Sequence, residues 1–322
     1  MQRRDYLFTL LGFLVAPGAW AQADFPKRPI KIIAPYPPGG TTDLFARSIG
    51  DYLQHSMGQP IVVENRPGSA GMIGANLVAQ SHPDGYTLLL GSQSLFATHP
   101  SLYEKLPYDP ARDFTPITLI ARLPSYVAVP ADLPVRTLAD FIKYVRDNPG
   151  KVSYGSSGNG TAQHIYVELF KQQAKIDMTH VPYKGSPPLI NDLIAGHVQM
   201  AMDFGPNVIG FSRTGKLKLL AVSTRERSKA TPEVPTMQEA GIPNFDESTW
   251  FAMHGPAGMP ASLVNKLSSE IQSALRDPVI RARLEAAGTE PVGSTPEELR
   301  SLQTRETARL GEVIRRANIK AD

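Results

Sequence analysis

Residues 29–53, PIKIIAPYPPGGTTDLFARSIGDYL, contain the pattern that decides the fold. The run 29–35 is short and almost wholly apolar, which is typical of a buried strand. Segment 42–53 then places apolar side chains on one face at helical spacing, which predicts a helix. Between them lies a loop rich in proline and glycine. The same alternation continues with a strand at 60–64, a helix at 73–80 and a strand at 86–90.

This β-α-β-α-β order predicts a parallel sheet with helices on its faces. A second alternating unit runs from a helix at 138–146 to a strand at 217–222. Two further apolar runs, 117–129 and 248–253, read as strands without a neighbouring helix. After them the chain is helical, with helices predicted at 261–276, 278–287 and 296–317.

The two alternating units predict an α/β protein with two lobes around a cleft. About 300 residues also exceed what one small core needs. Lobe 1 is predicted to comprise residues 22–124 plus 246–322, and lobe 2 residues 125–245. The chain then crosses between the lobes twice, and two crossings make a hinge. Ligands of open α/β sheets bind beyond the carboxyl ends of strands, which here face the cleft.

Residues 1–21 have the pattern of a signal peptide, which predicts export to the periplasm. Arg3 and Arg4 form a positive start, an apolar run follows, and 19–21 (AWA) is a cleavage site. The arginine pair also resembles a twin-arginine signal, so the export route stays open. The apolar run is about half the ~20 residues that span a bilayer, and no later run is long enough.

The composition argues against several functional classes. The chain has no cysteine, which excludes thiolate metal sites and cysteine nucleophiles. Its formal charge of +3 comes from scattered side chains, so nucleic-acid binding is not expected. The seven histidines lack metal-ligand spacing, and the glycines of 66–74 do not match the dinucleotide-binding fingerprint. We therefore expect no metal and no cofactor.

Two glycine-rich loops are the strongest candidates for a binding site. Loop 36–43 (YPPGGTTD) and loop 155–161 (GSSGNGT) each lead into a predicted helix. A helix N-terminus presents free N–H groups to an anion without needing Lys or Arg. We expect Thr41 or Thr42 to cap the first helix, and Thr161 to be the N-cap or the first residue of the second. The simpler alternative for each loop is a strand-to-helix turn with ordinary capping.

Enzymatic motifs are weak. Residues 155–159 lack the last glycine of a G-x-S-x-G nucleophile elbow. His164 is expected to make a structural or ligand-orienting hydrogen bond rather than act in catalysis. Asp43 is expected to complement its helix N-terminus and hold loop donors in place, and Asp203 to end a strand at the cleft. We expect no catalytic residue.

The sequence resembles the substrate-binding proteins of tripartite tricarboxylate transporters, also called the Bug family. The resemblance covers essentially the whole chain after the signal peptide. Its motifs, in order, are YPPGGTTDLFAR (36–47), VENRPGSAGMIGANLVA (63–79), PDGYTLLLGS (83–92), DFTPIT (113–118), GSSGNGTAQH (155–164), VPYKGSPPLINDLIAG (181–196), PTMQEAGIP (235–243) and GPAGMP (255–260).

The resemblance implies a type II periplasmic-binding-protein fold whose lobes close on a small carboxylate. The ligand would be a di- or tricarboxylate, an acidic amino acid or an aromatic acid. The implied binding residues of lobe 1 are Tyr36, Gly39, Gly40, Thr41, Thr42, Asp43 and Ser92, and those of lobe 2 are Ser156, Gly158, Thr161, Ala162, His164, Tyr183 and Asp203.

The expected protein is thus a monomeric periplasmic receptor that delivers its ligand to membrane permease subunits. Two alternatives remain open at this point. One is a sensory binding protein that presents its liganded form to a membrane kinase. The other is a periplasmic hydrolase that uses Ser156 or Ser157.

Overall fold

The computed structural model describes residues 25–316 and 319–320. The predicted signal peptide lies outside them. Among the described residues, no helix has both the length and the hydropathy needed to cross a bilayer.

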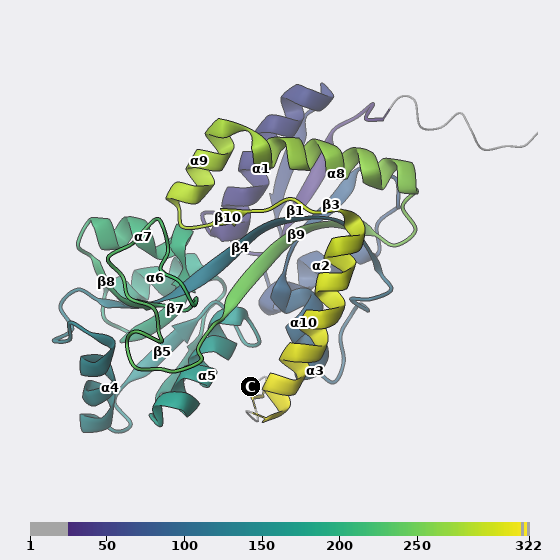
Figure 1. Ribbon diagram of the computed structural model, residues 1–322. Helices are drawn as coiled ribbons and strands as arrows, with labels where there is room; N and C mark the ends of the chain where they lie inside the picture. Colours follow the sequence, from purple (N-terminus) through teal and green to yellow (C-terminus); the bar gives the residue numbers. More distant parts are fainter. Residues whose placement is uncertain (1–24, 317–318, 321–322) are drawn as a thin grey trace, which may run out of the picture.

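Both alternating units form helix-covered strands within one long, curved sheet (Figure 1). Its strand order is β2-β1-β3-β9-β4-β7-β5-β6, with β8 and β10 also paired to β4. Strand β1 pairs in parallel with β2 and β3, and β5 pairs in parallel with β6 and β7, as the alternation predicts.

We use lobe 1 for the part built on the first of these parallel groups together with the C-terminal helices. Its elements before the crossing are β1 (Ile30–Ala34), α1 (Thr41–Met57), β2 (Ile61–Asn65), the 3-10 turn η1 (Ser69–Gly71), α2 (Met72–Ala79), β3 (Thr87–Ser92), the π-helix η2 (Ser94–Thr98) and α3 (His99–Leu102). Those at the end of the chain are α8 (Ala261–Arg276), α9 (Pro278–Ala286), β10 (Glu290–Pro291) and α10 (Pro296–Arg316).

We use lobe 2 for the part built on the second parallel group. Its elements are α4 (Leu138–Asp147), β5 (Ser153–Ser156), α5 (Ala162–Ala174), β6 (Thr179–Pro182), α6 (Ser186–Ile194), β7 (Met200–Phe204), α7 (Gly205–Arg213) and β8 (Leu217–Val222).

Two long antiparallel strands, β4 (Phe114–Pro130) and β9 (Ser248–Pro256), join the lobes. Figure 1 shows them running side by side out of lobe 1. Strand β4 continues into lobe 2, where it pairs with β7 and β8. The predicted apolar run 117–129 therefore lies within one strand.

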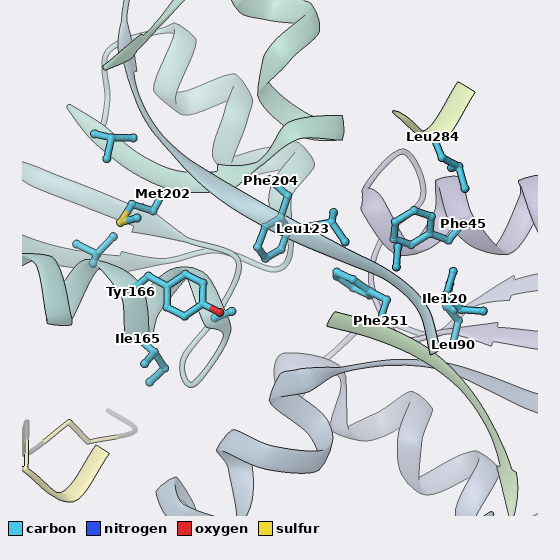
Figure 2. Packing of buried hydrophobic residues seen from close by; sticks show 14 of the residues in the cluster. Phe45, Leu90, Ile120, Leu123, Ile165, Tyr166, Met202, Phe204, Phe251 and Leu284 are labelled. Carbon is cyan, nitrogen blue, oxygen red and sulfur yellow. The ribbon is translucent and has the colours of Figure 1, made fainter. Parts of the chain in front are cut away.

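The hydrophobic core is continuous between the lobes. One cluster of buried side chains includes Phe45 and Ile120 of lobe 1 as well as Tyr166 and Met202 of lobe 2. Figure 2 shows Leu123 of β4 between these two groups. The connecting strands thus carry apolar packing as well as the main chain.

The capping of the first helix differs from the prediction. Gly40, not Thr41 or Thr42, is the N-cap of α1, and its extended backbone leaves both threonines inside the first turn. Glycine is acceptable at an N-cap because the position needs extended backbone and leaves N–H groups available to other partners. Thr161 is the N-cap of α5, as predicted, but its side chain makes no capping bond.

Candidate functional site

A cavity lies between the lobes, and residues of α1, α5 and β9 are in its wall. The empty space in it, counted together with its open mouth, is about 420 Å³. Among the described residues that line it there is no Lys, Arg, Asp or Glu. The lining consists of Tyr36, Pro37, Gly40, Thr41, Thr42, Ser92, Ser94, Thr249 and Phe251 from lobe 1 and of Ser157, Ala162, Gln163, Ser186, Pro187 and Phe204 from lobe 2.

The N-terminus of α1 forms one wall of this cavity. Thr41 and Thr42 are its first two residues and are 5% and 2% exposed. Within the described part of the chain, no group lies within hydrogen-bond distance of Thr41 Oγ1. A buried hydroxyl without a partner costs free energy, so this oxygen is available to a ligand together with the N–H groups of the helix.

Asp43 holds the loop before α1 in place. Its Oδ2 accepts from Gly39 N at 3.0 Å, and Arg47 Nε donates to the same carboxylate at 3.0 Å. Gly39 has a φ of 83°, a left-handed conformation that glycine adopts without strain. Burial alone would raise the pKa of Asp43, but the Arg47 and Gly39 hydrogen bonds outweigh it and lower that pKa. This is the role that the sequence predicted for Asp43.

Two neutral hydroxyls complete the lobe 1 wall. Tyr36 Oη lies 3.3 Å from Ser92 Oγ and donates to Ala70 O at 3.1 Å. Burial raises the pKa of Tyr36 to about 12, so its hydroxyl keeps its proton near neutral pH. The wall therefore presents hydrogen-bonding groups without a side-chain charge.

The N-terminus of α5 faces the same cavity from lobe 2 but is already partly used. Ala162 N donates to Ser94 Oγ of lobe 1 at 3.1 Å. The Thr161 hydroxyl donates to Gly158 O at 2.7 Å. The N-terminus of α5 thus already donates one of its N–H groups to the other lobe.

Asp203 lies behind the lobe 2 wall. Its Oδ1 accepts from Phe204 N at 2.7 Å, Asn207 Nδ2 at 2.8 Å and Gln163 Nε2 at 3.3 Å. Its Oδ2 is buried and has no hydrogen-bond partner among the described residues. Burial raises the pKa of Asp203 above its ordinary value, although these donors oppose the shift.

A group of buried side chains shapes loop 155–161 from behind. Ser156 Oγ lies 2.7 Å from His180 Nε2, and Ser156 has no exposed surface. His164 Nδ1 accepts from Gly160 N at 3.2 Å, and its ring stacks on His180 with centroids 4.2 Å apart. Ser156 and His164 thus make structural contacts here.

The structure brings six of the predicted site residues to the cavity wall and places eight elsewhere. The six are Tyr36, Gly40, Thr41, Thr42, Ser92 and Ala162. The eight are Gly39, Asp43, Ser156, Gly158, Thr161, His164, Tyr183 and Asp203. They support the loops or lie beneath the wall, and Tyr183, for example, donates to Asp192 Oδ2 at 2.8 Å.

Nine lining residues are not among the predicted site residues, although Pro37 and Ser157 lie in the two predicted loops. Ser186 and Pro187 begin a helix after a parallel strand, which is the same signal that identified the other two loops. Phe204 ends β7 and Phe251 lies in β9, and an apolar residue in a strand gives no sign of a site. Their rings meet edge-on with centroids 5.9 Å apart (Figure 2). The other missed residues are Pro37, Ser94, Ser157, Gln163 and Thr249.

No group of three or more His, Cys, Asp or Glu side chains in the described ranges could hold a metal ion.

Comparison with known proteins gives consistent matches over nearly the whole chain. The sequence model described as "Tripartite tricarboxylate transporter family receptor" matches residues 45–319. An R. palustris protein solved with adipate is 37% identical with a TM-score of 0.90, over 92% of this chain and 99% of that one. The periplasmic binding protein BugD is 32% identical with a TM-score of 0.88, over 92% and 99%. MatC from Rhodopseudomonas palustris with bound malate is 32% identical with a TM-score of 0.86, over 90% and 99%.

Proposed function

The chain belongs to the family of tripartite tricarboxylate transporter receptors, and from this membership we propose that it binds a small organic carboxylate in the cavity between its lobes. It then delivers the acid to the membrane permease subunits of such a transporter. Similar proteins are described with adipate and with malate, which are both small carboxylic acids.

The observation that carries the proposal is the N-terminus of α1 at the cavity wall. Thr41 Oγ1 is buried there without a partner among the described residues, and the first helical N–H groups lie beside it. Helix N-termini favour anions through their free N–H groups and their dipole. A carboxylate can therefore be held although no cationic side chain lines the cavity in the described ranges.

The wider role follows from the same proposal. We propose that residues 1–21 direct export to the periplasm and that the protein acts there as a monomeric receptor rather than an enzyme. We also propose that two units open and close about β4 and β9. One unit is residues 22–124 with 246–322, and the other is residues 125–245. Closure would enclose the acid between α1 and the lobe 2 wall.

Calorimetry and thermal unfolding with a panel of acids would test the proposal. Adipate, malate, glutamate and benzoate are compared with adipamide, which keeps the adipate chain but lacks carboxylates. At 100 times Kd a bound acid should raise the unfolding free energy by about 2.7 kcal/mol, whereas adipamide should have no effect. Failure of every acid in the panel to bind would contradict the proposal.

Thr41→Val tests the α1 site within this experiment. The change removes the hydroxyl and keeps the branched shape, so it should weaken acid binding by about 10- to 150-fold through loss of a charged hydrogen bond. Thr115→Val is the matched control, because the Thr115 hydroxyl donates to Pro256 O far from the cavity. Equal affinity of Thr41→Val and wild type would remove Thr41 from the site.

A further inference from the structure

Two consecutive residues of lobe 1 accept hydrogen bonds from one face of α5 in lobe 2. Ser94 Oγ accepts from Ala162 N at 3.1 Å, and Gln93 Oε1 accepts from Tyr166 Oη at 3.2 Å. Residues 162 and 166 are one helical turn apart, so they share a face of α5. All four residues are at most 3% exposed. We call Gln93, Ser94, Ala162 and Tyr166 the clasp.

The local backbone explains how two adjacent side chains reach the same helix. Gln93 directly precedes the π-helix Ser94–Thr98, which continues without a break into α3. Single π-turns are rare and occur often at functional sites. A third bond lies close by, because Tyr103 Oη donates to Asn159 O of lobe 2 at 3.0 Å.

On the lobe 1 side, Gln93 is also linked by polar contacts to the segment through which the chain returns from lobe 2. Gln93 Nε2 donates to Glu306 Oε2 of α10 at 2.9 Å. Arg309 pairs with Glu306 at 3.0 Å and with Glu247 at 3.1 Å. Glu247 directly precedes β9, the strand by which the chain returns to lobe 1. The clasp is thus one end of a polar network that reaches the hinge.

Gln93 and Tyr166 do not line the cavity, so neither side chain contacts a ligand there. Their hydrogen bond joins protein groups of the two lobes alone. When only a closed state binds, apparent affinity falls in proportion to the fraction of molecules that are closed. A bond between the lobes that breaks when they open would therefore set affinity without touching the ligand.

From this geometry we infer that Gln93 and Tyr166 are positioning residues that set ligand affinity from outside the cavity by stabilising lobe closure. The inference rests on the proposed function, since it concerns regulation of the same binding site. It also predicts that the protein without any ligand opens more when the bond is removed. This change can be measured even if no acid binds, so the test of the inference is separate from the test of the proposed function.

Tyr166→Phe is the main test, because it removes one hydroxyl and leaves Gln93 Oε1 buried without a partner only when the lobes are closed. Small-angle X-ray scattering without ligand should show a larger radius of gyration than wild type. Adipate and malate should bind about 5- to 30-fold more weakly by calorimetry. Fluorescence of Trp250, the only tryptophan after residue 21, reports on the crossing strand β9.

Tyr154→Phe is the matched control. Tyr154 is fully buried, and its hydroxyl donates to Glu168 Oε1 at 2.6 Å within lobe 2. This variant should lose stability but keep the wild-type radius and affinity. Tyr103→Phe is a second test at a less buried position and should shift radius and affinity in the same direction as Tyr166→Phe.

Unchanged radius in both Tyr166→Phe and Tyr103→Phe would overturn the inference, even if no acid binds. An equal loss of affinity in Tyr154→Phe would also overturn it, because the effect would then follow general stability. If no acid in the panel binds but the radius increases as expected, the proposed function fails and the role of the clasp in closure stands.

Discussion

Added side-chain atoms at Gly40, the N-cap of α1, would meet the opposite lobe. A Cβ built there would lie 3.8 Å from Pro187 Cδ of lobe 2 and 3.7 Å from Pro37 O, which are ordinary contact distances. Gly40→Ala should therefore bind acids within about 2-fold of wild type. Gly40→Val adds branches that overpack this contact, at a typical cost of about 1–3 kcal/mol.

We therefore expect Gly40→Val to weaken adipate binding by at least about 5-fold in calorimetry, with a melting temperature close to that of wild type. The φ of −90° at Gly40 is accessible to any residue, so backbone strain does not confuse the comparison. Affinity in Gly40→Val equal to that in Gly40→Ala would show that this side of α1 does not approach lobe 2 when the acid binds.

Asp203 gives a prediction on stability and pH. Burial raises its pKa in the folded state, so the unfolded chain releases this proton at lower pH than the folded protein does. The folded state binds more protons between the two pKa values, and stability from this group falls as pH rises through that window. Asp203→Asn keeps an oxygen acceptor for Phe204 N and Asn207 Nδ2 but does not titrate.

Urea unfolding should show Asp203→Asn to be more stable than wild type at pH 7, with a difference that narrows as pH falls towards 4. A loss of stability that is the same at both pH values would mean that the carboxylate oxygens are needed for packing or hydrogen bonding. That result would contradict the prediction of a buried acid destabilised by ionisation.

At the scale of elements, Ser223 forms hydrogen bonds with both segments that connect the lobes. Its hydroxyl accepts from Ser125 N of β4 at 2.8 Å and donates to Glu247 O, just before β9, at 2.5 Å. Ser223→Ala leaves a buried backbone N–H without a partner. We expect a loss of about 1–3 kcal/mol in unfolding free energy by urea titration, whereas Ser228→Ala in a neighbouring loop should lose less. Equal losses would show that the crossing does not depend on this hydroxyl.

Sequence periodicity predicted the elements well where one local rule controls them. The strand Leu217–Val222 and the helix Ala261–Arg276 were predicted with their observed bounds. The π-helix Ser94–Thr98 was missed because its turns depend on contacts with α10 and α3 rather than on local periodicity. The same segment supplies Ser94 to the cavity, so part of the site was missed with it.

The candidate site shows the same limit. Loop 36–43 was identified because glycine, proline and threonine before a helix have local meaning. Phe204 and Phe251 carry no such local signal, and they come together because β7 and β9 both pair with β4. The contact that Tyr166 makes depends on α5 meeting Gln93, which is far from it in the sequence. A single sequence does not reveal such a contact.

For the whole molecule, two buried histidines of lobe 1 make stability depend on acid pH. His99 and His254 have no exposed surface, and burial lowers the pKa of each to about 3. Gln303 Nε2 lies 3.0 Å from His254 Nε2, an arrangement suited to a neutral ring that accepts the bond. The unfolded chain binds a proton on each histidine near pH 6.5, well before the folded protein does.

The folded pKa is thus below the unfolded one, and stability is lost as pH falls from about 6.5 towards 3, by about 1.4 kcal/mol per pH unit for each histidine. His254→Phe should remove one such contribution, since phenylalanine fits beside Phe96 and Phe114. Urea titrations from pH 7 to pH 4 should give a shallower loss of stability in the variant by about that slope. Parallel curves for variant and wild type would show that His254 does not stay neutral in the folded protein over this range.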